Sequence, residues 1–531
     1  MFILKKFGQI SLLVVITLCF SASAFAAPNR NLTNTGQYTS LFIPVQILGI
    51  NDFHGQLNTT SQISGNNVGR ADYLAAYLKQ REKENKNTII VHAGDSVGAS
   101  APVSSLLQDE PTIEFMNMTG FDVGVPGNHE FDEGPDEMMR LLNGGYHDAT
   151  GDFEGADFPY VSANIVYTET GENILPSYVI KKVNGIPIAF IGVTLSETPR
   201  ITTPSGVAGL KFGDEIDAVN KAVGKLKKDK IKSIIVLAHV DGFYDQDAKE
   251  VSGKLDNLAK SIDDEVDVII AGHSHAGINN IVDGKLIVES YSNGMAFSDI
   301  DLKIDPRTKD IIAKKAEIIT TFQKGIKPDA KVNQLISRYE KIVEPIANTT
   351  IATAKSAIIK NQNESGESAL GNLIADAQRW EMGTDFAFTN PGGIRANIEE
   401  GEVTWEDLYR VQPFNNDLVK MTLTGAQINS LLNQQFTVNR ILQISGLKYT
   451  WKDGAVVDIF LTDGITPIDP LANYTITVNS YLASGGDGFT KLKEGTNKEI
   501  GTTDLNGLIN YLKKLPQPFN ASIEGRINKL L

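Results

Sequence analysis

The sequence has almost no cysteine: Cys19 is the only one among its 531 residues. Structural disulfide bonds within the chain and paired-thiol chemistry are therefore excluded. Basic residues are also few, with 49 Lys and Arg against 64 Asp and Glu, and the formal net charge is −15. This charge argues against nucleic acid or an anionic membrane surface as the main partner. A small phosphorylated ligand would need local positive charge.

Long hydrophobic runs are absent except near the N-terminus. Lys5 and Lys6 precede an apolar run at 10–20 and an Ala-Phe-Ala sequence at 24–26. This order is typical of a cleavable signal peptide, so we predict one over residues 1–26. The alternative is an uncleaved anchor. We expect a mature protein without a stable membrane anchor, exported to the periplasm or the extracellular space. The sequence leaves its oligomeric state open.

The remaining composition is that of a large globular protein. It is 41% hydrophobic, with 47 Gly and 20 Pro, which excludes disordered and collagen-like chains. Nearly continuous apolar runs predict buried strands at 45–50, 88–92, 234–238 and 266–271. With amphipathic segments between some of them, they indicate an α/β layered domain over 45–328. We predict a connecting helix at 329–349 and a smaller α+β domain at 350–531.

Polar side chains gather directly after these predicted strands. They are Asp52, His54, Asp95, Asn128, His129, His239, His273 and His275. Five of the seven histidines of the chain are in this set, and none follows residue 275. His92, inside a strand, and His147, in a polar loop, are assigned no function. Each segment alone is an ordinary turn or cap, but ligand sites of α/β sheets lie at the carboxyl ends of strands, where the segments can meet.

The combined nitrogen and oxygen donors suffice for two divalent metal ions. Asp95 is the most economical carboxylate to bridge them. Such a mixed set favours Mn²⁺, Zn²⁺ or Co²⁺ over Mg²⁺ alone, and the sequence leaves their identity unknown.

These segments also carry a family resemblance. The motifs are Asp52-Phe-His54, Gly94-Asp95, Gly127-Asn-His-Glu130, Gly272-His-Ser-His275, Gly371-Asn372, Asn390-Pro-Gly-Gly-Ile-Arg395 and Ala483-Ser-Gly-Gly-Asp-Gly-Phe489. The first four resemble the metallophosphoesterase signature, and together they resemble the secreted bacterial 5′-nucleotidase family. That family includes UDP-sugar hydrolases and 2′,3′-cyclic phosphodiesterases, and the resemblance extends from about residue 45 to 500. It implies a calcineurin-like metallophosphoesterase domain followed by a C-terminal substrate-binding domain.

The resemblance implies a role for each first-domain residue. One metal would be held by Asp52, His54, Asp95 and His275. The other would be held by Asp95, Asn128, His239 and His273. His129 and Asp132 resemble the catalytic dyad, in which the carboxylate orients an imidazole that faces the phosphoryl group.

The second domain is expected to bind the substrate through Asn390, Arg395, Phe414, Tyr481 and Asp487. Arg395 follows two glycines in the Asn390 motif and offers paired donors to phosphate, although a surface ion pair is the alternative. The resemblance implies that Phe414 and Tyr481 stack on the base and that Asp487 binds the ribose. From the residues alone, Phe414 and Tyr481 would be core rings and Asp487 a turn residue.

Two features depart from the family. Relatives carry a further arginine shortly before the Gly-Asn motif, whereas residues 360–370 contain none, and His275 stands where some relatives have an amide. We predict release of phosphate from nucleoside 5′-monophosphates by metal-activated water. The alternatives are a phosphodiesterase or pyrophosphatase on cyclic nucleotides or nucleotide sugars, and a non-catalytic nucleotide-binding protein. A sulfur-ester hydrolase on the same scaffold is a further possibility within the superfamily.

Overall fold

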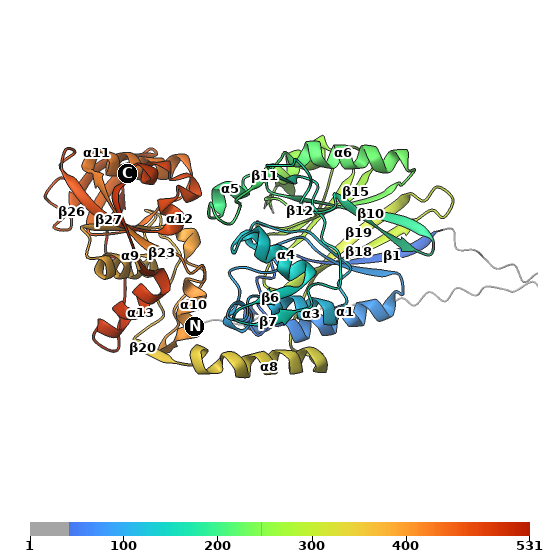
Figure 1. Ribbon diagram of the computed structural model, residues 1–531, viewed down its shortest axis with the longest axis horizontal. Helices are drawn as coiled ribbons and strands as arrows, with labels where there is room; N and C mark the ends of the chain where they lie inside the picture. The colour runs from blue at the N-terminus through green and yellow to red at the C-terminus, as the bar shows by residue number, and fades with distance from the viewer. Residues whose placement is uncertain (1–41, 246, 531) are drawn as a thin grey trace, which may run out of the picture. The chain divides into compact units, whose positions relative to one another are not determined.

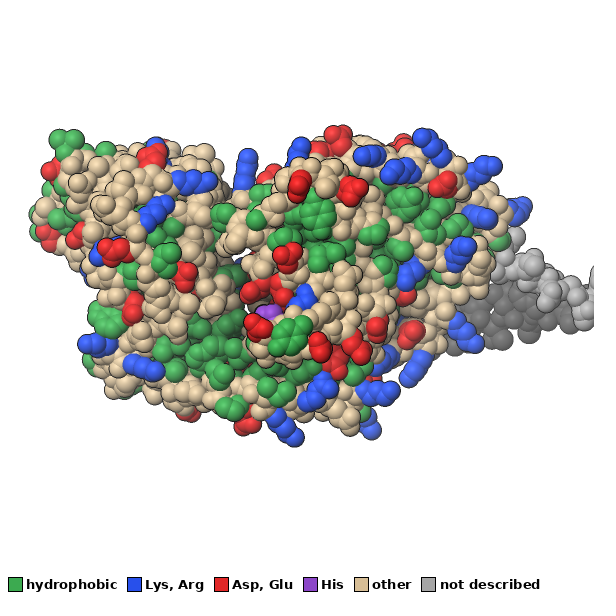
Figure 2. All heavy atoms as spheres, in the orientation of Figure 1, with side chains coloured by type: hydrophobic (Ala, Val, Ile, Leu, Met, Phe, Trp, Pro, Cys, Tyr) green, Lys and Arg blue, Asp and Glu red, His purple; other side chains and the backbone are tan. Residues whose placement is uncertain are grey.

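The computed structural model describes residues 42–245 and 247–530, which belong to one compact unit (Figure 1). The predicted signal peptide at 1–26, with Cys19, lies outside the described residues. Within the described part of the chain, no helix is long and apolar enough to cross a membrane. On the face in Figure 2, basic side chains are interspersed with acidic ones.

Two β-sheets form the centre of the N-terminal part of the chain. The first has the order β19-β18-β1-β4-β5 and consists of β1 (Ile43–Ile50), β4 (Thr88–His92), β5 (Val123–Gly124), β18 (Ala296–Ile304) and β19 (Ile311–Thr320). The second has the order β16-β17-β15-β12-β10-β9 and consists of β9 (Tyr178–Val183), β10 (Ile186–Thr194), β12 (Ser233–His239), β15 (Val266–Ala271), β16 (Gly277–Val282) and β17 (Lys285–Ser290). β1, β4 and β5 run parallel, as do β10, β12, β15 and β17.

The apolar runs of the sequence become strands covered on both faces. All seven residues of β12 are buried. Between the sheets, Ile47 and Val91 of the first share a core with Leu237 and Ile270 of the second. Because both faces of the central strands exclude water, β1, β12 and β15 are nearly continuous apolar runs in the sequence.

Helices cover the outer faces of the two sheets, as Figure 1 shows for α1 and α6 on opposite sides. Those on the first sheet are α1 (Ala71–Glu84), α3 (Glu110–Thr119) and α8 (Ala330–Ala347). Those on the second are α6 (Glu215–Lys228) and α7 (Lys254–Ser261). The resulting helix–sheet–sheet–helix order confirms the predicted α/β layered class.

Helix α8 occupies the region of the expected connector. Asp329 caps its N-terminus by accepting hydrogen bonds from the N–H groups of Lys331 and Val332. The helix continues two residues past Pro345 and ends two residues before the predicted end at residue 349. Its apolar side chains, including Leu335, pack in the same core as α1 and α3. The domain boundaries at its ends remain predictions.

A further five-stranded sheet forms the centre of the C-terminal part. Its order is β24-β21-β27-β23-β28, from β21 (Phe386–Thr389), β23 (Asp417–Thr424), β24 (Gln443–Ser445), β27 (Asn473–Asn479) and β28 (Thr496–Thr503). Helix α11 (Gly425–Thr437) shares one core with this sheet. A second core contains α9 (Ala369–Met382), α10 (Trp405–Val411) and α13 (Asp504–Lys514).

Candidate active site

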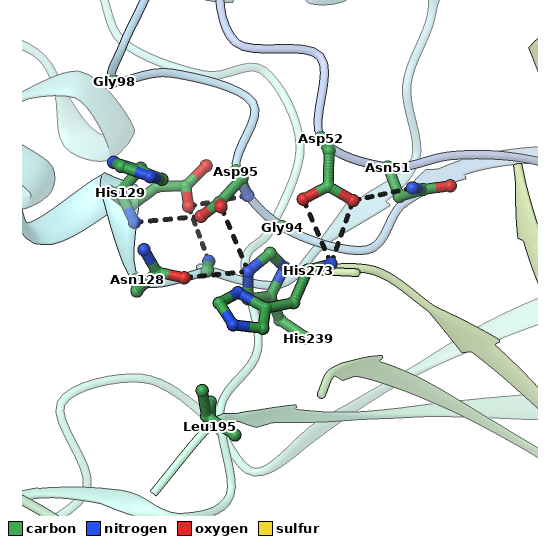
Figure 3. Close-up of polar contacts among 12 residues, drawn as sticks. Asn51, Asp52, Gly94, Asp95, Gly98, Asn128, His129, Leu195, His239 and His273 are labelled. Atoms are coloured by element: carbon green, nitrogen blue, oxygen red, sulfur yellow. Dashed lines mark hydrogen bonds and ion pairs between the residues drawn. The ribbon is translucent and has the colours of Figure 1, made fainter. Parts of the chain in front are cut away.

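The predicted first-domain residues meet at the carboxyl ends of five strands. Asp52 and His54 follow β1, Asp95 follows β4, and Asn128 follows β5. In the second sheet, His239 is the last residue of β12, and β15 is followed by His273 and His275. Figure 3 shows Asp52, Asp95, Asn128, His129, His239 and His273 converging from these different segments.

Three clusters of possible metal ligands overlap in this region. They are Asp52 with His54 and His275, His54 with Asp95 and His129, and Asp95 with His239 and His273, each with ligand atoms within 4.8 Å of one another. Asp95 belongs to two of them and is 1% exposed. Its Oδ2 is 3.2 Å from His239 Nε2 and 3.9 Å from His54 Nε2. It therefore lies where a bridging carboxylate is needed.

The remaining predicted ligands complete the two groups. His275 Nε2 lies 3.4 Å from Asp52 Oδ1 and 3.3 Å from His54 Nε2. On the other side of Asp95, Asn128 Oδ1 lies 3.2 Å from His239 Nε2. All seven predicted ligand residues are thus brought together.

Backbone carbonyls orient two of the imidazoles. His54 Nδ1 lies 2.8 Å from the carbonyl oxygen of Gly98, and His239 Nδ1 lies 2.9 Å from that of Ala93. A carbonyl only accepts, so Nδ1 carries the proton in both rings and Nε2 points into the cluster. Such second contacts fix the tautomer of a metal-ligating histidine.

The charges of the site fit cation binding. Burial lowers the pKa of His54 to about 3 and that of His273 to about 4, so both imidazoles are neutral near pH 7, the form that ligates metals. Burial opposes ionisation of Asp95, but the neighbouring imidazoles, His239 foremost, outweigh it and hold the pKa of Asp95 well below its usual value. Asp95 in turn overcomes burial and raises the pKa of His239 to about 10, so a metal ion that binds His239 Nε2 would displace a proton.

Among the described residues, two buried histidine ring nitrogens have no hydrogen-bond partner, His92 Nε2 in β4 and His273 Nδ1 among the predicted ligands. His273 Nδ1 is inaccessible to solvent and accepts or donates no hydrogen bond among the described residues. An unpaired buried nitrogen is costly unless something else satisfies it. With the mixed imidazole, carboxylate and amide donors around it, this atom fits a divalent metal ion.

His129 and Asp132 form the expected pair beside the ligand clusters. His129 Nδ1 is 2.7 Å from Asp132 Oδ2, and the His129 N–H donates to Asp95 Oδ1 over 2.9 Å. Burial alone would lower the pKa of His129, but the carboxylates of Asp132 and Asp95 outweigh it and raise that pKa. The imidazolium form is therefore favoured at this place.

The ligand loops have a strained backbone. Asp52, His54, Asp95, His273 and His275 have φ between +49° and +84°, in the left-handed region. A non-glycine residue there costs on the order of 1–3 kcal/mol and persists only when its surroundings enforce it. The strain turns consecutive polar side chains of each loop toward the site.

Three residues that enforce these loops were not singled out in the sequence. The Glu130 carboxylate accepts N–H bonds from Asp95 (2.9 Å), Ser96 (2.7 Å) and Gly127 (2.5 Å), which ties the loop after β4 to that after β5. Its place in the Gly127–Glu130 motif was the only signal for it.

Glu289 and Asn51 support the other loops. Glu289 accepts hydrogen bonds from the Ser274 hydroxyl and the Ala276 N–H, within the loop that carries His273 and His275. Asn51 Nδ2 donates to Asp52 Oδ2 over 2.6 Å. No motif in the sequence marked either residue.

A pocket of about 220 Å³ adjoins the metal-ligand clusters. Its lining residues come from both halves of the chain: Asn128, His129, Asp132, Ile201, Thr202, Thr203, His273, Asn390, Gly392, Gly393, Arg395, Phe414, Asn416, Arg440, Asn479, Tyr481 and Asp487. All five residues expected to bind substrate are among them. Arg440 and Asn416 are additions that the sequence did not indicate.

Tyr481, Asp487 and Asn390 form one hydrogen-bonded group in this pocket. The Tyr481 hydroxyl donates to Asp487 Oδ1 over 2.9 Å, and Asn390 Nδ2 donates to Asp487 Oδ2 over 3.1 Å. A Cβ added to Gly486 would lie within 2.6 Å of three atoms of the Tyr481 ring, so the backbone there packs against one ring face. These contacts hold the ring and the carboxylate in fixed positions.

Phe414, which the resemblance places against the base, has its ring stacked on His129, with centroids 5.6 Å apart and an interplanar angle of 12°. The Arg395 guanidinium lies 5.7 Å from the same ring's centroid, a cation–π distance. Burial lowers the pKa of Arg395, and the carboxylates of Asp95, Asp132 and Asp52 oppose this shift. The Arg395 charge thus acts on the metal-ligand clusters.

Lys360 lies in the segment that lacks the family's extra arginine. Lys360 Nζ donates to the Arg395 carbonyl oxygen over 3.2 Å. Burial and the nearby Arg395 charge lower the pKa of Lys360. Positive charge beside Arg395 is therefore retained in a different form.

Comparison with known proteins identifies the family of this chain. The model of calcineurin-like phosphoesterases matches residues 45–277, and the model of the 5′-nucleotidase C-terminal domain matches residues 345–494. Cell wall protein Lmo0130 of Listeria monocytogenes is 36% identical over 90% of this chain and 68% of its own length. The chain belongs to the 5′-nucleotidase family of metallophosphoesterases. This confirms the predicted family and the assignment to phosphoric-ester hydrolases.

Further known proteins are similar to this chain in sequence or structure. Endonuclease YhcR of Bacillus subtilis is 42% identical over 96% of this chain, which spans 43% of YhcR. The crystal structure of a 5′-nucleotidase precursor from Thermus thermophilus is similar with a TM-score of 0.79 and 28% identity, over 92% of this chain and 99% of that one. The 5′-nucleotidase of Vibrio vulnificus is 27% identical over 84% of this chain and 86% of its own length.

Proposed function

We propose that this protein is an exported, dimetal-dependent phosphohydrolase that releases phosphate from nucleoside 5′-monophosphates. The observation that carries the proposal is the position of Asp95, which is shared by two clusters of metal-ligating side chains and accepts a hydrogen bond from His129. The adjoining pocket contains Arg395 and two aromatic rings, as a nucleotide requires.

Each metal would have four protein ligands. Asp52, His54, Asp95 and His275 would hold one ion, and Asp95, Asn128, His239 and His273 would hold the other. Two divalent ions bound there would neutralise phosphate oxygens and make a water molecule acidic enough to act as nucleophile. Mn²⁺, Zn²⁺ and Co²⁺ suit these donors.

The dyad and Arg395 would act on the phosphate ester itself. The raised pKa of His129 favours the imidazolium form, in which His129 would donate a hydrogen bond to the phosphoryl group and a proton to the leaving oxygen. Asp132 orients the ring through Nδ1. Arg395 presents paired donors that match two phosphate oxygens.

The nucleoside would be held at the other end of the pocket. Tyr481 presents the ring face opposite Gly486 to a base, and Asp487, aligned by Asn390, would accept hydrogen bonds from ribose hydroxyls. Phe414, one face of which lies against His129, would stack on the same base.

A second candidate is a phosphodiesterase or pyrophosphatase on cyclic nucleotides or nucleotide sugars. It is favoured by Lys360, which lies near Arg395 in the segment where relatives have a further arginine. The single ammonium group of a lysine cannot bind two phosphate oxygens side by side as a guanidinium does. A weaker grip on a monoester dianion follows from that replacement. A non-catalytic nucleotide-binding role is disfavoured because a binding protein has no need of the His129–Asp132 pair.

Domain division and export are parts of the same proposal. We divide the protein into a metal-binding domain at 45–328, a connecting helix at 329–349 and a substrate domain at 350–531. A signal peptide at 1–26 would direct the chain out of the cytoplasm. The description of a relative as a cell wall protein supports an extracellular position.

The experiment uses protein purified without added metal and measures phosphate release from AMP and, by chromatography, the nucleoside monophosphate formed from cyclic AMP and UDP-glucose. We expect release from AMP that chelation abolishes and Mn²⁺, Zn²⁺ or Co²⁺ restores. Faster hydrolysis of either diester substrate would favour the second candidate. Full activity in protein shown by elemental analysis to be metal-free would refute the dimetal mechanism.

A further inference from the structure

Arg440 is a pocket residue with a constrained backbone. It lies in the turn between α11 and β24, and its N–H donates to the Gln435 carbonyl over 2.9 Å. The side chain of Gln435 is itself fixed, because it donates to the Tyr449 hydroxyl and accepts from the Leu442 N–H. The turn therefore holds Arg440 at a defined place on the pocket wall.

This turn lies against the loop that carries Asp487. A Cβ added to Gly488 would stand 2.8 Å from Val438 Cγ1, so the two segments are in close contact. The charge of Arg440 also acts on the Tyr481 hydroxyl, whose pKa it lowers against the larger, raising effect of burial. Arg440 is thus a neighbour of the proposed ribose site, whereas Arg395 faces the metal-ligand carboxylates.

The Arg440 side chain is exposed at the pocket. Among the residues that the structure describes, no carboxylate forms a salt bridge with it. The nearby carboxylate of Asp487 is engaged by Tyr481 and Asn390 through its two oxygens. An unpaired guanidinium in a ligand pocket is suited to a planar or tetrahedral anion.

We propose that Arg440 forms a second anion subsite, which binds a phosphate group carried on the ribose 3′-oxygen of a nucleoside 5′-phosphate. The subsite rests on the proposed function, because it takes the ribose to lie at Asp487. The 2′-hydroxyl would remain bound to Asp487, and the 3′-substituent would leave the pocket past Arg440. Such a phosphate occurs in nucleoside 3′,5′-bisphosphates and at the 5′ end of an oligonucleotide.

The test compares AMP, adenosine 3′,5′-bisphosphate and the 5′-phosphorylated dinucleotide pApA as substrates. In the wild type we expect KM for the bisphosphate to be roughly tenfold below that for AMP, with similar kcat, as for one charge-assisted contact. Arg440→Ala should remove this difference and Arg440→Lys should retain part of it. Lys513→Ala, which removes an exposed charge outside the pocket, is the matched control and should keep the ratio.

Further readouts separate the possible outcomes. If KM relative to AMP falls equally for pApA and for the bisphosphate, the subsite also accepts oligonucleotide ends. If KM falls for the bisphosphate alone, the subsite binds only free bisphosphates. Equal KM values for all three wild-type substrates, or a ratio unchanged in Arg440→Ala, would overturn the subsite. If the protein hydrolyses none of them, calorimetric Kd values for AMP and the bisphosphate test the subsite independently of the proposed activity.

Discussion

Replacing Glu130 tests whether a buried carboxylate organises the metal-binding loops. Glu130 is 5% exposed and accepts three backbone N–H groups from the loops that carry Asp95 and Asn128. It does not line the pocket that adjoins the metal-ligand clusters and is no metal ligand in our proposal. Any effect on metal binding must therefore act through the backbone of its neighbours.

The magnitude follows from those three hydrogen bonds. Glu130→Ala would leave three N–H donors unsatisfied, at about 1–3 kcal/mol each, or about 3–9 kcal/mol in all. Because whole domains are stable by only about 5–15 kcal/mol, this variant is a poor probe. Glu130→Gln keeps one acceptor oxygen and the side-chain shape, so we expect a loss of about 1–3 kcal/mol, the cost of one stranded donor.

The assay is calorimetric metal binding together with thermal unfolding of Glu130→Gln. We expect metal affinity to fall about 10–100-fold, the usual effect of losing an outer-sphere partner. Glu154→Gln removes the same charge from an exposed site and should leave both quantities unchanged. Wild-type metal affinity and wild-type Tm in Glu130→Gln would refute the reasoning.

Three other predictions follow from the site and its surroundings. His129→Ala should retain both metals by elemental analysis and lose kcat by about 10²–10⁴-fold, whereas Asp95→Ala should lose metal; the reverse pattern would exchange their roles. Arg395→Ala should raise KM for AMP strongly and spare p-nitrophenyl phosphate, because a generic ester needs only the metals and the dyad, and equal losses would contradict this. Burial raises the pKa of Asp504 to about 7, so its stabilising contribution is full below its unfolded value of about 3.9 and is lost as pH rises through 7. Asp504→Asn should therefore gain Tm relative to wild type at pH 8 and not at pH 4, and a pH-independent difference would disprove that assignment.

The sequence predicted the layered class and the position of the polar segments. Continuous apolar runs such as 234–238 predict strands covered on both faces. A polar residue directly after such a run lies at the carboxyl end of its strand. Ligand residues are visible in sequence for this reason: Asp52, Asp95 and His239 each follow or end a buried strand. The family motifs assigned an expected role to each of these residues. The family itself is confirmed.

What the sequence did not reveal depends on contacts between distant segments. Glu130 bonds backbone groups 34 and 35 positions away, and Glu289 supports a loop 13 to 15 positions before it. A carboxylate whose partners are backbone N–H groups leaves no residue pattern, because every non-proline residue offers such a donor. Only the fold shows these two as parts of the site.

The stacking of Phe414 on His129 and the approach of Arg440 to Tyr481 have the same origin. The members of the first pair are separated by 285 positions in the chain and those of the second by 41, and local sequence constrains neither distance. The sequence determined which side chains stand at the ends of buried strands, since a strand covered on both faces is a continuous apolar run in the sequence. The tertiary structure decided which of them share a carboxylate, a ring face or an uncompensated charge, since these depend on how separate loops approach one another.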